Sequence, residues 1–192
     1  MSGNIRLYNT SGYVELQAPS SASAQVLELP TDSIQPGLVH LHTETFSAKS
    51  TVSISDVFSS TYDNYRLVLT HSGGNEDVNF RLQSSGTPST TNYSDQTVAG
   101  DGASATAGRV TRGSVNLGIN TNPGISDFAI HAPFLTQVTA LVGFGGNAYN
   151  GSHIRMITGI HSIASSYDGF TLTPGGAGTI SGIAHIYGYR NS

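Results

Sequence analysis

The stretch from Ser152 to Arg190, SHIRMITGIHSIASSYDGFTLTPGGAGTISGIAHIYGYR, decides the fold. Apolar residues recur at alternate positions in three runs within it, Ser152–Ile163, Gly169–Thr173 and Thr179–Arg190, and this is the period of a β-strand. Glycine, proline and aspartate separate the runs, and these residues favour tight turns. The stretch therefore predicts three strands, arranged as a β-hairpin region that ends in a long closing strand.

The closing run is apolar on both of its faces. One face carries Ile180, Gly182, Ala184 and Ile186, and the opposite face carries Ile183, His185, Tyr187 and Tyr189. A single sandwich buries only one face of each sheet. We therefore expect a second sheet or another copy of the chain to cover the other face, and the second set is the predicted interface of a homotrimer.

The same reading extends through the preceding residues and indicates about eight to ten strands without a helix. The additional predicted strands are Leu38–Phe46, Thr51–Ile54, Tyr65–His71, Asp77–Gln83, Tyr93–Val98, Val110–Ile119, Asp127–Ala132 and Val138–Phe144. The third and fourth of these are expected to form a hairpin across a Gly-rich turn, and residues 84–108 a polar surface excursion. The pattern predicts an all-β fold, an antiparallel β-sandwich or jelly roll over residues 38–192.

Alternation also predicts which side chains face the core. Tyr65, Leu67 and Leu69 form one such set, followed by Val78, Phe80 and Leu82, and then by Phe128 and Ile130. In Val138–Phe144 the expected inward residues are Val138, Ala140, Val142 and Phe144. In the first run of the closing stretch, Ile154, Met156, Thr158 and Ile160 share one face.

Residues 1–37 differ from the rest, because they hold only short strand-like pieces, Ile5–Tyr8, Tyr13–Gln17 and Gln25–Leu29. Pieces this short do not build a core of their own. They are either edge strands of the main domain or an extended N-terminal arm that docks on a neighbouring subunit, and we adopt the arm. The residues expected to bury themselves on the neighbour are Leu7, Tyr8, Tyr13, Val14, Leu16, Leu27 and Leu29.

Composition argues against several classes of partner. Charged residues are 10% of the chain and the net charge is −4 without a basic cluster, so a nucleic-acid partner is not expected. The absence of cysteine excludes disulfides and thiolate chemistry. No apolar run reaches the ~18 residues of a membrane span, and the opening residues do not resemble a secretory signal, so we expect no membrane partner.

Several segments resemble virion proteins of tailed bacteriophages. They are Ser11–Pro19 (SGYVELQAP), Leu27–Pro30 (LELP), Ile54–Leu69 (ISDVFSSTYDNYRLVL), Asn92–Ser94 (NYS), Gly100–Ala105 (GDGASA) and the closing Gly178–Tyr189. Together they are distributed along most of the chain, in the order of a phage β-sandwich family. The resemblance implies a trimeric virion surface protein without catalytic residues, assembled in the bacterial host cytoplasm.

The resemblance alone does not separate capsid from tail. Tail-fibre proteins are commonly longer and carry a shaft, whereas here an arm joins one sandwich directly. We therefore expect a capsid decoration, or cement, protein on the capsid surface, with the major capsid protein of the same virion as its partner. The alternative is a trimeric tail-fibre or receptor-binding module that recognises a host surface glycan.

Three other groups of residues have the types needed for binding or catalysis. His40, His42 and Glu44 alternate on one predicted strand and form a candidate divalent-metal set, with a polar strand face as the alternative. Ser181, His161 and Asp168 have the residue types of a hydrolytic triad but not its motif. Five loop tyrosines form a candidate sugar platform, with ordinary packing against the sandwich as the alternative: Tyr62, Tyr65, Tyr93, Tyr149 and Tyr167. We expect no enzyme activity, metal or cofactor.

Overall fold

The computed structural model describes residues 4–9, 12–17, 37–73, 77–100, 103–117, 124–147 and 153–191. The chain divides into two compact units, Met1–Ile34 and Gln35–Ser192. The first unit contains an antiparallel hairpin of β1 (Asn4–Asn9) and β2 (Gly12–Gln17). The first two N-terminal pieces therefore pair with each other, and the third, Gln25–Leu29, lies outside the described residues.

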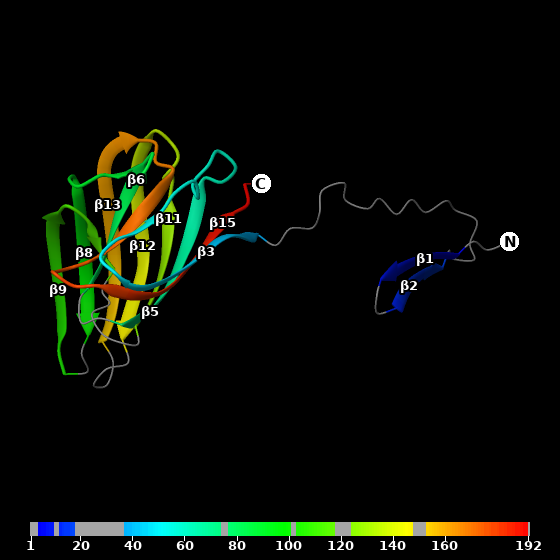
Figure 1. The fold of residues 1–192 in the computed structure, drawn as a ribbon, viewed down its shortest axis with the longest axis horizontal. Coiled ribbons are helices and arrows are strands. Elements are labelled where there is room, and N and C mark those ends of the chain that lie inside the picture. Colours follow the sequence, from blue (N-terminus) through cyan, green and yellow to red (C-terminus); the bar gives the residue numbers. More distant parts are fainter. Residues whose placement is uncertain are drawn as a thin grey trace. The chain divides into compact units, whose positions relative to one another are not determined.

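The second unit is an antiparallel β-sandwich, and no helix occurs among the residues that the structure describes. The fold class predicted from the sequence is confirmed. In order across the larger, eight-stranded sheet lie β3 (Leu38–Lys49), β15 (Ile180–Tyr189), β5 (Asn64–Gly73), β11 (Gly124–His131), β12 (Gln137–Asn147), β13 (His153–Ser165), β8 (Tyr93–Gly100) and β9 (Ala105–Arg112) (Figure 1).

The smaller sheet covers part of one face of the larger one. Its strands run in the order β10 (Val115–Asn116), β6 (Val78–Ser84), β14 (Gly169–Pro174) and β4 (Val52–Ile54), and β7 (Thr87–Pro88) pairs with β6. Hydrogen bonds also join the two layers. The Tyr93 hydroxyl of β8 accepts the Leu82 main-chain N–H of β6 at 2.8 Å, and the Ser126 hydroxyl of β11 donates to the Leu117 carbonyl at 3.2 Å.

The core fills the space between the sheets, as the alternating pattern predicted for three strands. The predicted inward residues of β5, β6 and β11 are all buried, namely Tyr65, Leu67, Leu69, Val78, Phe80, Leu82, Phe128 and Ile130. Phe170 of β14 stacks on Phe80 with ring centroids 5.0 Å apart. In β15 the face with Ile180, Ala184 and Ile186 is the buried one.

Several predictions of strand pairing are wrong. β5 and β6 do not form a hairpin, because β5 pairs with β15 and β11 in the large sheet while β6 pairs with β14 and β10 in the small one. The closing stretch is not a hairpin region, since β13, β14 and β15 alternate between the sheets. The predicted excursion over residues 84–108 holds β7, β8 and part of β9, and the predicted strand Val110–Ile119 breaks between β9 and β10.

The predicted inward face of β12 is also wrong. Leu141 is fully buried and Thr139 lies beside it in the core, whereas Val138, Val142 and Phe144 are exposed. In β13 the predicted grouping of Ile154, Met156, Thr158 and Ile160 on one face is confirmed. This face is the outer one, because Ile157 is buried whereas those four residues are exposed. Both strands therefore turn their larger apolar residues away from the core.

Candidate functional site

The outer face of the eight-stranded sheet, opposite the core, is apolar over β11, β12, β13 and β8. We call this surface the apolar half. Its members are 39–67% exposed: Val98, Ile125, Val142, Phe144, Ile154, Met156 and Ile160. Isolated apolar residues on a surface are ordinary, but a contiguous group of this kind marks an interaction surface.

The strand register brings the apolar half into one continuous surface. Phe144 of β12 lies directly opposite Met156 of β13, which lies opposite Val98 of β8. Directly opposed residues in antiparallel strands share a face and have Cβ atoms about 5 Å apart. Val142 and Ile154 occupy the neighbouring rows on either side of this one.

Glycines on the inward face explain why the bulk lies outside. The β10 segment of the small sheet comes so close to β13 that a methyl group added at Gly159 would lie 2.6 Å from Cγ2 of Val115. Gly145 of β12 meets the main-chain oxygen of Leu117 in the same way. Because side chains are excluded at Gly145 and Gly159, these strands can place large residues at the neighbouring positions only on the outer face.

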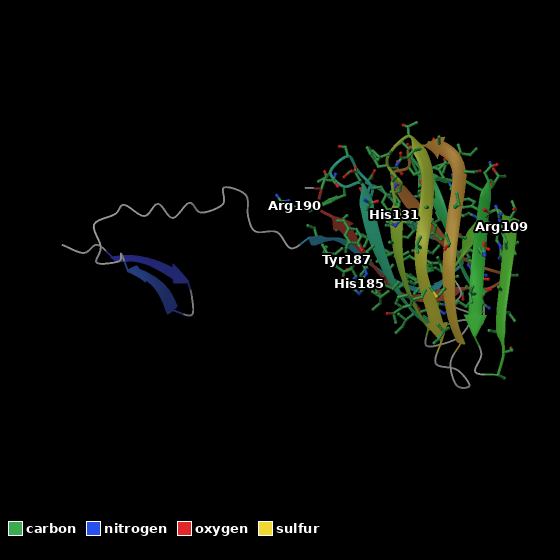
Figure 2. All side chains as sticks on the ribbon, turned by 180° about the vertical axis from the view of Figure 1, so that it is seen from behind. Arg109, His131, His185, Tyr187 and Arg190 are labelled. Atoms are coloured by element: carbon green, nitrogen blue, oxygen red, sulfur yellow. The ribbon has the colours of Figure 1, made fainter. Side chains whose placement is uncertain are left out.

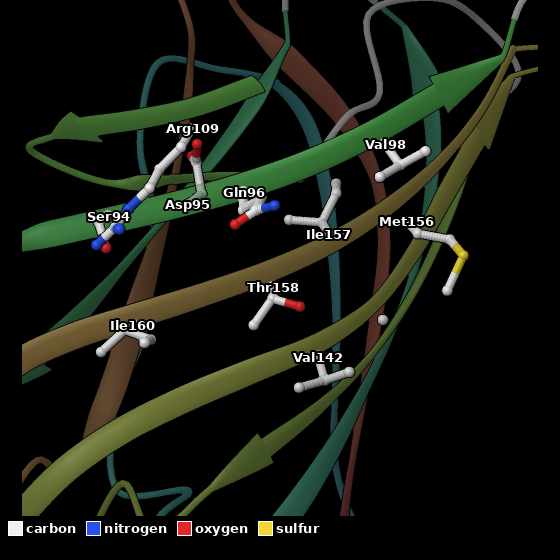
Figure 3. A pocket seen from close by; sticks show the side chains of 11 residues that line it. Ser94, Asp95, Gln96, Val98, Arg109, Val142, Met156, Ile157, Thr158 and Ile160 are labelled. Carbon is white, nitrogen blue, oxygen red and sulfur yellow. The ribbon is translucent and has the colours of Figure 1, made fainter. Parts of the chain in front are cut away.

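A hollow of about 520 Å³ opens on the apolar half, over β8, β12 and β13 (Figure 3). Its lining is mixed, with apolar Val98, Val142 and Met156 beside polar Ser94, Gln96, Thr158 and Arg109. The hollow can receive apolar side chains of a protein partner, and its hydroxyl, amide and guanidinium groups can also hydrogen-bond a polar ligand.

The other end of the outer face is polar. On β3 and β15, the Thr43 hydroxyl lies 2.8 Å from Nε2 of His40 and 3.0 Å from Nδ1 of His185. This hydroxyl can donate to one ring nitrogen while it accepts an N–H from the other. The ring of Tyr187 meets His40 edge-on with centroids 5.4 Å apart. Figure 2 shows His185 and Tyr187 at this end of the sheet and Arg109 at the opposite end.

The residues of the predicted trimer interface are brought together on this polar end. Ile183, His185, Tyr187 and Tyr189 alternate along the outer face of β15, and Ile183 and Tyr189 are each 37% exposed. Next to them, Arg66 of β5 makes a bidentate ion pair with Asp127 of β11. Hydrogen bonding to this carboxylate raises the pKa of the Arg66 guanidinium.

The arm residues fall into two groups. Leu7, Tyr8, Tyr13, Val14 and Leu16 lie in β1 and β2, where Leu7 pairs with Val14 and Tyr8 with Tyr13. Leu27 and Leu29 lie outside the described residues.

The candidate metal set is separated by a bulge in β3. The register pairs Ile186 with His42 but Tyr187 with His40, so Leu41 is an extra residue. A bulge reverses the alternation, and it leaves His40 on the outer face while His42 pairs with Glu44 at 3.2 Å. Among the described residues, no three His, Asp or Glu side chains are grouped closely enough to hold a metal ion.

The candidate triad is likewise not assembled. His161 is buried, with Nε2 2.9 Å from the Ser89 hydroxyl and Nδ1 3.2 Å from the Tyr167 hydroxyl. Burial lowers the pKa of this histidine. Ser181 instead accepts a main-chain N–H from Ala48.

The tyrosines considered for a sugar platform are mainly core residues. Tyr65, Tyr93 and Tyr167 are buried, and Tyr62 packs against the core. Tyr149 lies outside the described residues. Burial raises the pKa of Tyr93 to about 12, and its hydroxyl is used inside the sandwich rather than at the surface.

Comparisons with family models, curated proteins and solved structures found no match to this chain. Among the residues that the structure describes, no helix is long and apolar enough to cross a membrane. The outer sheet face is therefore the candidate functional site, and its apolar half over β12 and β13 was not predicted from the sequence. The available signal was the run of inward glycines in β12 and β13, which alternate with bulky residues.

Proposed function

We propose that this protein is a non-enzymatic structural component of a tailed-bacteriophage virion, a decoration protein bound to the capsid surface. The observation that carries the proposal is the apolar half, where seven large apolar residues stand exposed on one sheet face. Such a face favours a function in protein assembly. The segmental resemblance to phage virion proteins supports the choice of assembly.

The N-terminal hairpin supports a docking role for the arm. A two-stranded hairpin is marginally stable in water by itself and gains stability when its apolar face is covered. The register pairs Leu7 with Val14 and Ile5 with Leu16, which are apolar residues. In the proposal this arm binds the major capsid protein, where strand pairing satisfies main-chain groups and side chains are buried.

The proposed assembly state is a homotrimer. The outer face of β15, with Ile183, His185, Tyr187 and Tyr189, is the contact predicted from the sequence. Low charge supports association between copies, because only 10% of the residues are charged and repulsion between identical copies is correspondingly small.

The second candidate is a trimeric tail-fibre or receptor-binding module for a host surface glycan. The hollow on the large sheet favours it, since Ser94, Gln96, Thr158 and Arg109 supply hydrogen-bonding groups next to an apolar floor. Sugar recognition needs such a combination of polar and apolar contacts.

Counting copies per virion separates the two functions. A capsid decoration protein is expected at a copy number comparable to that of the major capsid protein, measured by quantitative mass spectrometry of purified virions, with antibody labelling over the head. A few copies per particle with labelling at the tail tip would overturn the capsid proposal in favour of receptor binding. Absence from purified virions would overturn both.

A variant without the arm tests the mode of attachment. Deletion of residues 1–34 removes one compact unit and is expected to abolish capsid binding while the sandwich keeps a cooperative thermal transition. Full capsid binding by the truncated protein would contradict the docking role of the arm.

A further inference from the structure

We propose that the apolar half of the outer sheet face is the surface through which copies of this chain bind one another. The inference rests on the proposed function and deepens it by naming the occupant of this face as another copy of the same protein. Contacts between copies would then lie over β11, β12, β13 and β8, and not chiefly over β15.

The exposed apolar area is large enough for a specific interface. The seven residues of the apolar half are 39–67% exposed and together present roughly 650 Å², slightly above the ~300–600 Å² of the largest patch on a typical monomer. One partner in a standard interface contributes ~800 Å². Neighbouring Gln96, Thr158 and Ala129 would supply the remainder as a rim.

Two residues at the centre of this surface can act as anchors. Phe144 is 53% exposed, Met156 is 67% exposed, and they lie opposite each other on β12 and β13. Large apolar side chains at the centre of a patch carry most of the binding energy in protein interfaces. The adjoining hollow of about 520 Å³ offers space for such side chains from the facing copy (Figure 3).

Weak charge on this face permits contact between copies of the chain. A nearly uncharged surface adds little electrostatic repulsion when identical copies approach each other. Asp127 borders the apolar half already paired with Arg66, and Arg109 lies on β9 at the far side. No charged cluster of one sign is present on the described part of this face to select a partner of opposite charge.

The polar end of the same face is less suited to the contact. The hydroxyl of Thr43 already joins His40 and His185, and Tyr187 packs against His40. These groups are engaged with one another, and the two most exposed apolar residues of β15 are each only 37% exposed.

The test measures the mass of the full-length protein and of three double variants by light scattering and analytical ultracentrifugation. Phe144→Thr with Met156→Thr removes the anchors and keeps residues that suit a strand. The matched control, Ile183→Thr with Tyr189→Thr, makes equivalent changes on β15. The third variant, Leu7→Ser with Val14→Ser, removes two apolar residues from the hairpin, whose binding to this face is the competing outcome.

The wild type is expected as a closed oligomer, and the Phe144/Met156 variant as a monomer with a dissociation constant raised more than tenfold. Thermal melts at low concentration check that each variant remains folded. A monomeric or polydisperse wild type, an unchanged mass in the Phe144/Met156 variant, loss confined to the β15 variant, or loss in the hairpin variant would each overturn the inference.

These outcomes are independent of the virion measurement. A purified oligomer that dissociates as expected, from a protein absent from virions, would sustain the inference about the face and refute the proposed function. A virion protein whose mass is unaffected by the Phe144/Met156 changes would refute only the inference.

Discussion

Replacing Ile157 by alanine is expected to destabilise the sandwich far more than the same replacement at Ile154, although both are isoleucines of β13. Ile157 is 1% exposed and Ile154 is 63% exposed. The change removes about three carbon groups, worth ~0.8 kcal/mol each when buried, and the remaining cavity brings the usual cost to about 2–5 kcal/mol. The cross-strand neighbour of Ile157 is Gly143, which has no side chain to fill the space, so we expect about 3.5 kcal/mol.

At Ile154, in the monomeric state at low protein concentration, the transfer loss is small, and reduced strand propensity brings the cost to at most ~1 kcal/mol. Because both variants lose the same propensity, the difference between them, about 2.5 kcal/mol, isolates burial. Urea unfolding followed by circular dichroism measures it, and a slope of ~2 kcal/mol per molar converts the difference into a midpoint separation of roughly 1.2 M. Measurements at two protein concentrations separate association from folding. Equal midpoints would show that the inward face of β13 is assigned incorrectly.

Three further predictions concern the space between the sheets. Gly159→Ala is expected to lower stability by about 1–3 kcal/mol in thermal denaturation, because the methyl group would overlap Val115, whereas Gly108→Ala, which meets nothing within 4 Å, should be nearly neutral. Tyr93→Phe should cost about 1–3 kcal/mol in guanidinium unfolding, since a buried main-chain N–H of β6 loses its acceptor. Burial lowers the pKa of His161 in the folded protein, so the unfolded chain binds the proton first as the pH falls below about 6.5. Stability should therefore decline from about pH 6.5 toward the lower folded pKa, with a smaller decline in His161→Gln; an equal decline in the variant would exclude this histidine as the cause.

Alternation in the sequence predicts the existence of most strands, because a half-buried strand repeats every two residues whatever its partners. It also identifies the core face where only one face is apolar. In β5, Tyr65, Leu67 and Leu69 alternate with polar or half-buried residues, and their predicted burial is confirmed.

Pairing depends on contacts that local sequence does not encode. The turn after β5 has hairpin chemistry, yet β5 lies between β15 and β11 in the large sheet, and both come from later in the chain. The bulge at Leu41 likewise arises from the register between β3 and β15. It separates His40 from His42, which a strict period of two would have kept together.

The two faces of β12 could not be assigned from apolarity alone, because the bulkier face is the outer one. The inward positions of β12 are Leu141, Gly143 and Gly145, whereas Val142 and Phe144 face outward. A shift of the strand by one residue would place the larger residues in the core, but it would drive Phe144 against the main chain at Leu117, where even a methyl group is excluded. Close approach of the second sheet thus fixes the register. The close approach of the second sheet also leaves Phe144 and Met156 on the outer face. The alternating runs of β12 and β13 therefore encode both the packed interior and an apolar outer surface.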